Sequence, residues 1–261
     1  MPPGCAQRRG PQRVSLGRGA QAGPARVGNG SVSLATIDWG DVEDGLDATG
    51  FASLGVMLEA EARAALMAAF GESAPYRSHV HMARHGFGRG EYKYFRYPLP
   101  GPIATLRKRL YPGCADIANR WAERMRMDTR YPAEHADFVA TCQAAGQARP
   151  TPLILSYTEG DYNCLHQDLY GGIVFPLQIV ILLSEPDDFD GGEFVMTEQR
   201  PRMQSRAHVV PLRAGEAVVF AVNERPVKGV RGEYRVRMRH GVSTLRRGAR
   251  LATGIIFHEA T

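Results

Sequence analysis

The sequence predicts a mainly β protein, in which an antiparallel barrel or jelly roll is braced by helices that precede it. From residue 153 onward, short apolar segments alternate with turn residues such as Gly171-Gly172, Gly191-Gly192 and Ala214-Gly215. This rhythm is expected of many short antiparallel strands. Before that point, segments rich in Ala, Leu and Glu favour helices. Helices that precede such a sheet can cover its outer face.

Residues 1–30 are predicted to be a disordered tail, because they are rich in Gly, Pro, Ala and Arg and contain few large apolar side chains. The tail contains five arginines and no acidic residue, so its charge of +5 equals the formal net charge of +5 for the whole chain. The arginines are Arg8, Arg9, Arg13, Arg18 and Arg26. Residues 31–261 are therefore formally neutral, and the pI of about 9.2 does not indicate a basic catalytic domain.

Residues 31–152 are predicted to form a helical support region. The segment Leu58–Phe70 consists mainly of helix formers and is followed by Gly71, a common helix stop. Further helices are expected over residues 102–110, 114–127 and 134–145. Between these helices, residues 80–97 mix aromatic and basic side chains, and their second half resembles a strand.

Residues 153–261 are predicted to form the β domain. Strands are expected over residues 153–157, 174–183, 193–197, 207–211, 217–222, 234–242 and 252–258. Closing such a sheet would bring residues that are distant in sequence onto one inner wall.

Composition excludes several other classes of protein. No apolar run approaches the ~20 residues of a membrane-spanning helix, so no membrane partner is expected. The four cysteines form no CxxC pair and no zinc-ligand spacing, and no secretory signal is evident. A reduced cytoplasm is therefore the expected location.

Two histidines and an aspartate are the candidate metal ligands. His166 and Asp168 are two residues apart, and side chains at this spacing on an extended strand point to the same side. His240 must arrive from another strand. Two imidazoles and one carboxylate on one face of an octahedron suit iron(II) and leave positions open for substrate and oxygen. The chain is therefore predicted to be an enzyme.

The context of these residues is more specific than any one of them, since each alone is more often explained by ordinary packing or solvation. The apolar run 177–183 follows His166 and Asp168, and Arg250 lies ten residues after His240. This order resembles the iron(II)/2-oxoglutarate dioxygenases, especially their prolyl-hydroxylase-like branch, over residues 153–258. The resemblance implies a double-stranded β-helix, the jelly roll of that superfamily, with His166, Asp168 and His240 as the iron ligands.

The same resemblance implies a cosubstrate pocket. Arg250 would hold the far carboxylate of 2-oxoglutarate, because its planar fork can donate two parallel hydrogen bonds to a carboxylate. Tyr157 matches the position of a cosubstrate-contacting phenol, and Tyr162 and Gln178 are further candidates for the pocket. Relatives often have Ser or Thr two residues after the arginine, where this chain has Ala252 and then Thr253.

The activity implied is decarboxylation of 2-oxoglutarate to succinate, coupled to hydroxylation of a substrate C–H bond. Fe(2+), 2-oxoglutarate and O2 are the expected cofactors, with ascorbate as an auxiliary reductant. A carbon that is hydroxylated next to a nitrogen collapses to release an aldehyde. The substrate therefore decides between stable hydroxylation and demethylation.

The segments around residues 90–95, 166–170 and 198–206 resemble a bacterial oxygenase family expected to demethylate damaged DNA bases. Single-stranded or damaged DNA is thus a candidate partner. The segment 84–97 could supply aromatic stacking and phosphate contacts. A series of arginines could form a basic rim or, alternatively, a solvated sheet face: Arg200, Arg202, Arg206, Arg235, Arg237, Arg239, Arg246 and Arg247.

Two other functions stay open from the sequence. AlkB-type demethylases have an Arg-x5-Arg arrangement well beyond the second histidine, and this chain ends too soon after His240 to contain it. The position of Arg250 resembles that of a prolyl-hydroxylase-like protein or amino-acid hydroxylase. A third alternative is a noncatalytic sensor that binds iron or 2-oxoglutarate without turnover. The sequence indicates no oligomeric state.

Overall fold

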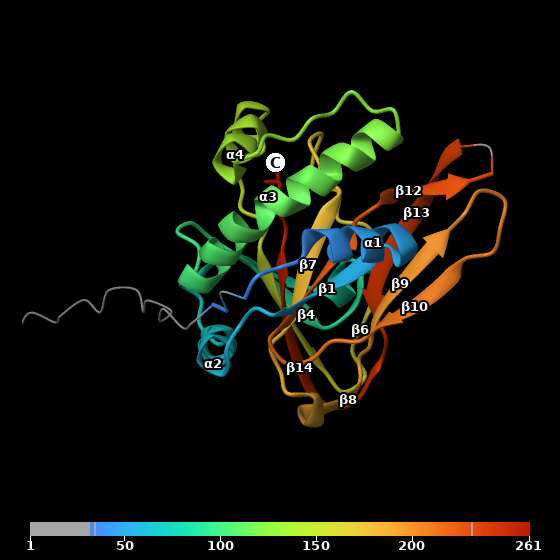
Figure 1. Cartoon of the computed structure of the whole chain (residues 1–261). Helices are drawn as coiled ribbons and strands as arrows, with labels where there is room; N and C mark the ends of the chain where they lie inside the picture. Colours follow the sequence, from blue (N-terminus) through green and yellow to red (C-terminus); the bar gives the residue numbers. More distant parts are fainter. Residues whose placement is uncertain (1–31, 34, 231) are drawn as a thin grey trace, which may run out of the picture.

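The computed structural model describes residues 32–33, 35–230 and 232–261, and it contains two antiparallel sheets that face each other (Figure 1). The tail predicted for residues 1–30 lies outside the described residues. The observed architecture is the jelly roll that the strand rhythm predicted.

The larger sheet has eight strands in the order β1-β11-β7-β14-β5-β4-β2, with β8 attached to β14. Their bounds are β1 (Phe51–Val56), β2 (Tyr76–His81), β4 (Glu91–Phe95), β5 (Leu153–Thr158), β7 (Leu177–Leu182), β8 (Phe189–Gly191), β11 (Glu216–Ala221) and β14 (Leu245–Ile255). Every residue of β7 is buried, because this central strand is covered on both faces.

The smaller sheet has six strands in the order β10-β9-β13-β6-β3, with β12 attached to β13. Their bounds are β3 (Gly88–Arg89), β6 (Tyr162–His166), β9 (Phe194–Gln199), β10 (Arg206–Val210), β12 (Glu224–Gly229) and β13 (Gly232–Val242). From Arg235 to His240, buried and exposed residues alternate along β13, as expected for a sheet with one face toward the core and one toward solvent.

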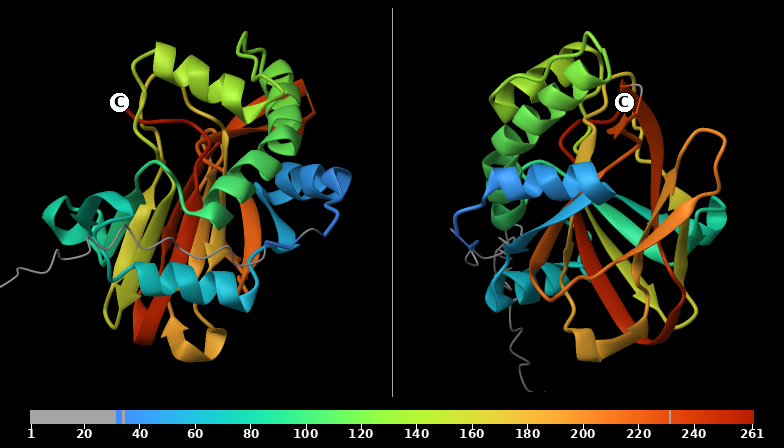
Figure 2. Two further views of the ribbon diagram at one scale, coloured as in Figure 1. Left: turned by 90° about the vertical axis from the view of Figure 1, so that its left-hand side faces the viewer. Right: turned by 45° about the vertical axis from the view of Figure 1, so that its right-hand side comes forward.

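Four α-helices of the described residues pack on the outer side of the larger sheet (Figures 1 and 2). They are α1 (Trp39–Thr49), α2 (Ala60–Ala69), α3 (Gly101–Arg124) and α4 (His135–Ala144), and two 3-10 helices cover Met82–Arg84 and Pro186–Asp188. Two of the α-helices, α1 and α3, also contact β12 of the smaller sheet. The longest, α3, buries one face that includes Leu106, Leu110 and Trp121. This arrangement confirms that helices brace the β core.

The structure corrects two sequence predictions for helices. Residues 102–110 and 114–127 were predicted as separate helices, but one helix, α3, continues through Pro112. A proline in a helix removes one hydrogen bond, and packing offsets that loss here. The neighbouring Gly113 leaves room for the Trp39 ring, which a Cβ atom at this position would meet at 2.1 Å. Helix α1 was missed, although Asp38 caps its first turn and Gly50 ends it in the left-handed conformation.

The strand predictions over 153–157, 193–197, 207–211, 217–222 and 234–242 correspond to β5, β9, β10, β11 and β13. Residues 174–183 and 252–258 were predicted as strands with different bounds, since β7 begins only at Leu177 and β14 begins earlier, at Leu245, and ends at Ile255. The strands β1, β2, β3, β6, β8 and β12 were not predicted. They lack the long apolar runs on which the predictions relied.

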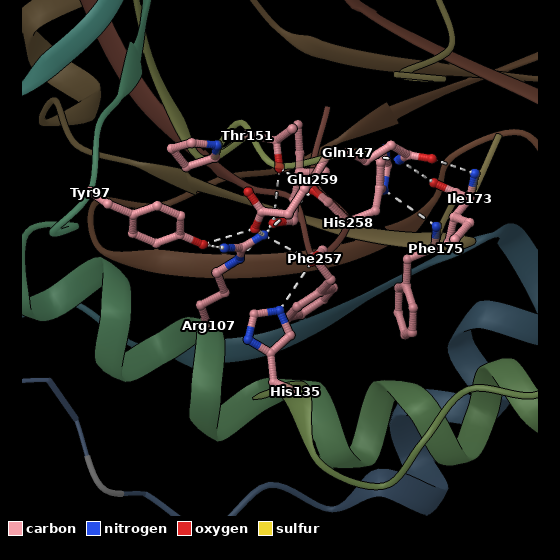
Figure 3. Close-up of polar contacts among 12 residues, drawn as sticks. Tyr97, Arg107, His135, Gln147, Thr151, Ile173, Phe175, Phe257, His258 and Glu259 are labelled. Atoms are coloured by element: carbon pink, nitrogen blue, oxygen red, sulfur yellow. Dashed lines mark hydrogen bonds and ion pairs between the residues drawn. The ribbon is translucent and has the colours of Figure 1, made fainter. Parts of the chain in front are cut away.

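The C-terminal segment after β14 is fastened to the helices by a buried polar network (Figure 3). Arg107 of α3 donates to the backbone oxygens of Ile256 and Phe257 at 2.9 and 2.8 Å, and its guanidinium lies 2.8 Å from the Glu259 carboxylate. Tyr97 donates to the same carboxylate at 2.9 Å. Gln147 and Thr151 donate to backbone oxygens of this segment. The network holds the end of β14, and hence the strand that carries Arg250.

Within the described part of the chain, no helix combines the length and the apolarity needed to cross a membrane.

Candidate active site

The three candidate metal ligands meet between the two sheets. β13 pairs with β6 so that His240 lies directly opposite His166, and the centroids of the two imidazole rings are 4.3 Å apart. Asp168 follows two residues after the end of β6. The Nε2 atoms of His166 and His240 each lie 3.4 Å from a different carboxylate oxygen of Asp168. Side chains from β6, from the loop after it and from β13 thus present their donor atoms to one point.

Local contacts orient these ligands. The Nδ1 atom of His166 is 2.8 Å from the backbone oxygen of Cys164 and donates to it, so Nε2 is the ring nitrogen that faces Asp168. His240 is buried and packs against the ring of Phe220, with centroids 4.8 Å apart. Tyr170 donates a hydrogen bond of 2.6 Å to Asp168. The sequence analysis did not identify Tyr170 as a site residue, although its spacing of two from Asp168 is a possible signal.

The electrostatics of the triad favour an ionised carboxylate beside imidazoles. Burial opposes the charge on Asp168, but hydrogen bonds from His166 and His240 outweigh burial and hold its pKa well below the usual range. Burial and the nearby His166 lower the pKa of His240. For His166, burial is outweighed by the hydrogen bond to Asp168, so its pKa is raised. A dication at this point would replace the protons that these groups otherwise share.

These residues line a cavity of about 330 Å³ that reaches from the triad to Arg250. The cavity wall is largely apolar and comes from both sheets: Leu153, Leu155, Val180, Phe194, Phe220 and Val242. A mostly apolar pocket with a few convergent polar groups is the usual form of a small-molecule site. The two histidines and Asp168 offer possible metal ligands in this cavity, and Arg250 adds a positive charge elsewhere in its lining.

Arg250 is 2% exposed, and its guanidinium has no hydrogen bond or ion pair with any described residue. Burial lowers the pKa of its guanidinium, while the charges of Tyr157 and Glu193 act in the opposite sense. The centroid of the Tyr157 ring lies 5.8 Å from its central carbon, which compensates only part of the lost hydration. A buried guanidinium without a partner is costly, so an anionic ligand in the cavity would stabilise it.

The other predicted cosubstrate residues divide into two groups. Tyr157 and Gln178 are buried and line the cavity, and the side-chain oxygen of Gln178 has no partner among the described residues. Tyr162 is 37% exposed and lies outside the cavity lining, so the structure does not place it with the others. Tyr162 is the first residue of β6, at the far end of that strand from His166.

The departure from the family pattern after Arg250 has a clear structural outcome. Ala252 lines the cavity and offers no hydroxyl there. Thr253 does not replace it, because the next residue of a strand points to the opposite face and its hydroxyl donates to the backbone oxygen of Leu153 at 2.8 Å. Tyr157, Asn163 and Gln178 are polar residues that line the same cavity as Arg250.

The donor set fits iron(II), since two imidazoles and one carboxylate on one side leave the cavity side open. A family model described as "Oxygenase, catalysing oxidative methylation of damaged DNA" matches residues 90–260. The chain belongs to this Oxygenase-NA family. Two uncharacterized proteins of Mycobacterium tuberculosis, from strains CDC 1551 and H37Rv, are each 47% identical to this oxygenase over 167 residues. The match covers 64% of this chain and 72% of each relative.

Two solved prolyl hydroxylase structures are similar to this chain. A prolyl hydroxylase from Trichoplax adhaerens, in complex with a peptide from a hypoxia inducible factor, matches with a TM-score of 0.51 and 13% identity over 83% of this chain and 86% of its own. A prolyl-4-hydroxylase from Pseudomonas putida matches with a TM-score of 0.47 and 16% identity over 86% of this chain and 100% of its own. The family model describes an oxygenase, so this protein is an enzyme, and the likeness to the Trichoplax adhaerens structure shows that the two chains share a fold.

Proposed function

We propose that His166, Asp168 and His240 hold the iron and that Arg250 holds the far carboxylate of 2-oxoglutarate. The observation that carries this proposal is the buried, unpartnered Arg250 in the same cavity as the triad. A small dicarboxylate that chelates the metal at one end would bring a negative charge to the guanidinium. Tyr157 and Gln178 would complete the polar contacts of the cosubstrate.

Bound iron, 2-oxoglutarate and O2 would together supply oxidative decarboxylation to succinate and the oxidation of a substrate C–H bond, with ascorbate as an auxiliary reductant. The chain's own residues bind, orient and exclude water. The two histidines and Asp168 lie on one side, so the remaining positions face the cavity. The apolar wall limits the access of water to a reactive site.

We propose a methylated base in single-stranded DNA as the substrate. The family description names damaged DNA, and the mouth of the cavity offers a platform for a base. Phe87 lines the cavity, is 48% exposed and is stacked on His85 with ring centroids 5.3 Å apart. Aromatic side chains stack on unpaired bases of any sequence. The exposed Arg84 and Arg89 flank this platform and could contact phosphates.

The arginines of β13 do not lie at the cavity, where a basic rim for DNA would be expected. Arg235, Arg237 and Arg239 share one exposed face, as predicted, but they alternate with residues that point inward, including His240. They therefore lie on the opposite face of the smaller sheet from the cavity. Arg235 also donates to the backbone oxygen of Met125 at 2.7 Å. These three residues serve as a solvated face, and the proposed phosphate contacts fall to the segment around Phe87.

Succinate release tests the proposal, with purified protein, iron(II), ascorbate and 2-oxoglutarate. Methylated single-stranded DNA, unmodified DNA and a proline-rich peptide pool are compared as substrates. Stimulation by methylated DNA alone, together with formaldehyde release, is the expected result. Stimulation by peptide would instead identify a protein hydroxylase, and absence of succinate under every condition would favour a noncatalytic sensor.

Alanine variants of the three ligands provide the control for the metal assignment. His166→Ala, Asp168→Ala and His240→Ala should each abolish iron-dependent succinate release, because each removes one of only three protein ligands. The exposed Tyr162→Phe is a matched control on the same strand, and it should leave succinate release unchanged. Full turnover in any of the three ligand variants would contradict the assignment.

A further inference from the structure

A second group of two histidines and a carboxylate lies on the outer face of the larger sheet. His79 and His81 are two residues apart on the edge strand β2, so they share one face, and Glu91 of β4 is the cross-strand partner of His81. In the described part of the chain, this cluster and the candidate iron site are the two groups whose donor atoms all lie within 4.8 Å of one another. We call it the His79–His81–Glu91 cluster.

The cluster contains one more imidazole than an ion pair requires. His79 Nε2 lies 2.5 Å from one carboxylate oxygen of Glu91, and His81 Nδ1 lies 3.6 Å from the same oxygen. The centroids of the two imidazole rings are 4.4 Å apart. One imidazole would suffice for an ion pair. Donor atoms of a tetrahedral zinc ion lie about 3.3 Å apart, because each bond is about 2.0–2.1 Å long. A small rotation of the Glu91 side chain, which is 33% exposed, would open that space.

The surroundings leave the cluster available to a cation. The side chains of His79, His81 and Glu91 are 39%, 45% and 33% exposed, so solvent can supply a fourth ligand. Lys93 lies opposite His79 on the same face, but its amino group donates to the backbone oxygen of Phe70 at 2.5 Å, in helix α2's C-terminal turn. Two histidines and a glutamate with water at the fourth position form a donor set that zinc accepts.

The position of the cluster links it to the cavity. His81 and Glu91 flank the excursion 82–90, which contains Gly86 and Phe87 of the cavity lining. Within this excursion, β3 pairs with β6, the strand that ends at His166. A backbone hydrogen bond of 3.0 Å from Met82 to Gly90 closes its base next to the cluster. An ion shared by both legs would fasten that base.

We propose that the His79–His81–Glu91 cluster is a second metal site that binds Zn²⁺ and fastens the base of the 82–90 excursion at the mouth of the cavity. The site is distinct from the candidate iron site in position and in its access to solvent. It does not depend on the identity of the substrate. Its ligands come from both legs of the excursion, so binding removes freedom from the segment between them.

The stoichiometry of Zn²⁺ binding tests this proposal, measured on tag-free protein by competition with a chromophoric chelator. The decisive background is the His166→Ala/His240→Ala variant, in which the candidate iron site is disabled. This variant should bind one equivalent of Zn²⁺, and adding His79→Ala/His81→Ala should abolish that binding. His85→Ala is the matched control, because it removes an exposed histidine of the same excursion and should leave the equivalent in place.

Two further measurements test the cluster without removing His79 or His81. Glu91→Gln in the otherwise unchanged protein retains both histidines and should also lose one equivalent. Zn²⁺ should slow amide exchange over residues 82–90 in the His166→Ala/His240→Ala variant. The proposal is overturned if that variant binds no Zn²⁺, if binding survives the loss of His79 and His81, or if exchange over 82–90 does not change.

Discussion

Two buried arginines, Arg107 and Arg250, have the same exposed fraction of 2% and opposite surroundings. Arg107 bonds to backbone oxygens, to Tyr97 and to the carboxylate of Glu259, which is itself fully buried. Arg250 has no such partner in the described part of the chain and borders the cavity. A buried charge is tolerated when its hydrogen bonds are satisfied. The first arginine therefore stabilises the fold, and the second is available to a ligand.

The largest expected effect comes from making the same substitution at both positions. Arg107→Met should lower the free energy of unfolding by about 3–5 kcal/mol, because it leaves the buried Glu259 charge unpaired. Arg250→Met should not lower it, because no partner loses a bond. Urea denaturation of both variants measures the difference. Equal losses of stability would remove the distinction between the two arginines.

Acid should act on the Arg107 region through two histidines. Burial lowers the pKa of His135 and of His258 to about 4. Their unfolded pKa is about 6.5, so each contributes stability above pH 6.5 that is lost as the pH falls toward 4. By pH 5 the loss should be about 2 kcal/mol per histidine.

His258→Gln isolates this effect from other titrating groups. The stability difference between the unmodified protein and the variant should shrink by about 2 kcal/mol between pH 7 and pH 5, as measured by urea denaturation at each pH. A difference that stays constant with pH would show that His258 is not held neutral by the fold.

Arg250→Gln should raise the 2-oxoglutarate concentration for half-maximal succinate release by about 10- to 100-fold, since charge-assisted hydrogen bonds to the carboxylate are lost. The affinity for iron should not change, because Arg250 is not among the candidate ligands. Succinate release as a function of 2-oxoglutarate and, separately, of iron measures both. A change in the iron requirement alone would contradict the role given to Arg250.

The smallest expected effect is at Tyr170, which lies between the candidate iron site and the buried C-terminal network of Arg107. Its hydroxyl donates to Asp168, and its ring centroid lies 5.9 Å from that of His258. Tyr170→Phe should weaken iron binding by about tenfold, because the hydrogen bond that orients the candidate ligand Asp168 is lost. Iron titration at saturating 2-oxoglutarate measures this. Unchanged iron affinity would restrict Tyr170 to a packing role.

Much of the site was predictable because strand periodicity is local. The spacing of His166 and Asp168 indicated one shared side, and the alternation at Arg235, Arg237 and Arg239 indicated one shared face. Which face looks inward depends on how the two sheets stack. The β13 arginines therefore proved to point away from the cavity, and Tyr162, although near His166 in sequence, proved to lie outside it.

Other features depend on partners that no local pattern reveals. The continuity of α3 through Pro112 depends on tertiary packing, including the fit of Trp39 against Gly113. The hydrogen bond from Tyr170 and the backbone contacts of Arg107 likewise join residues whose meeting requires the folded chain. Residue type alone did not distinguish Arg107 from Arg250.

By itself, the sequence determined the strand-rich character of residues 153–261, the identity and spacing of the candidate ligands, and the superfamily they resemble. These follow from side-chain chemistry and from the period of two along a strand. Only the tertiary structure decided which of the predicted residues share one cavity and which buried charges lack a partner. That information depends on sheet stacking and register, which are set by contacts between segments distant along the chain.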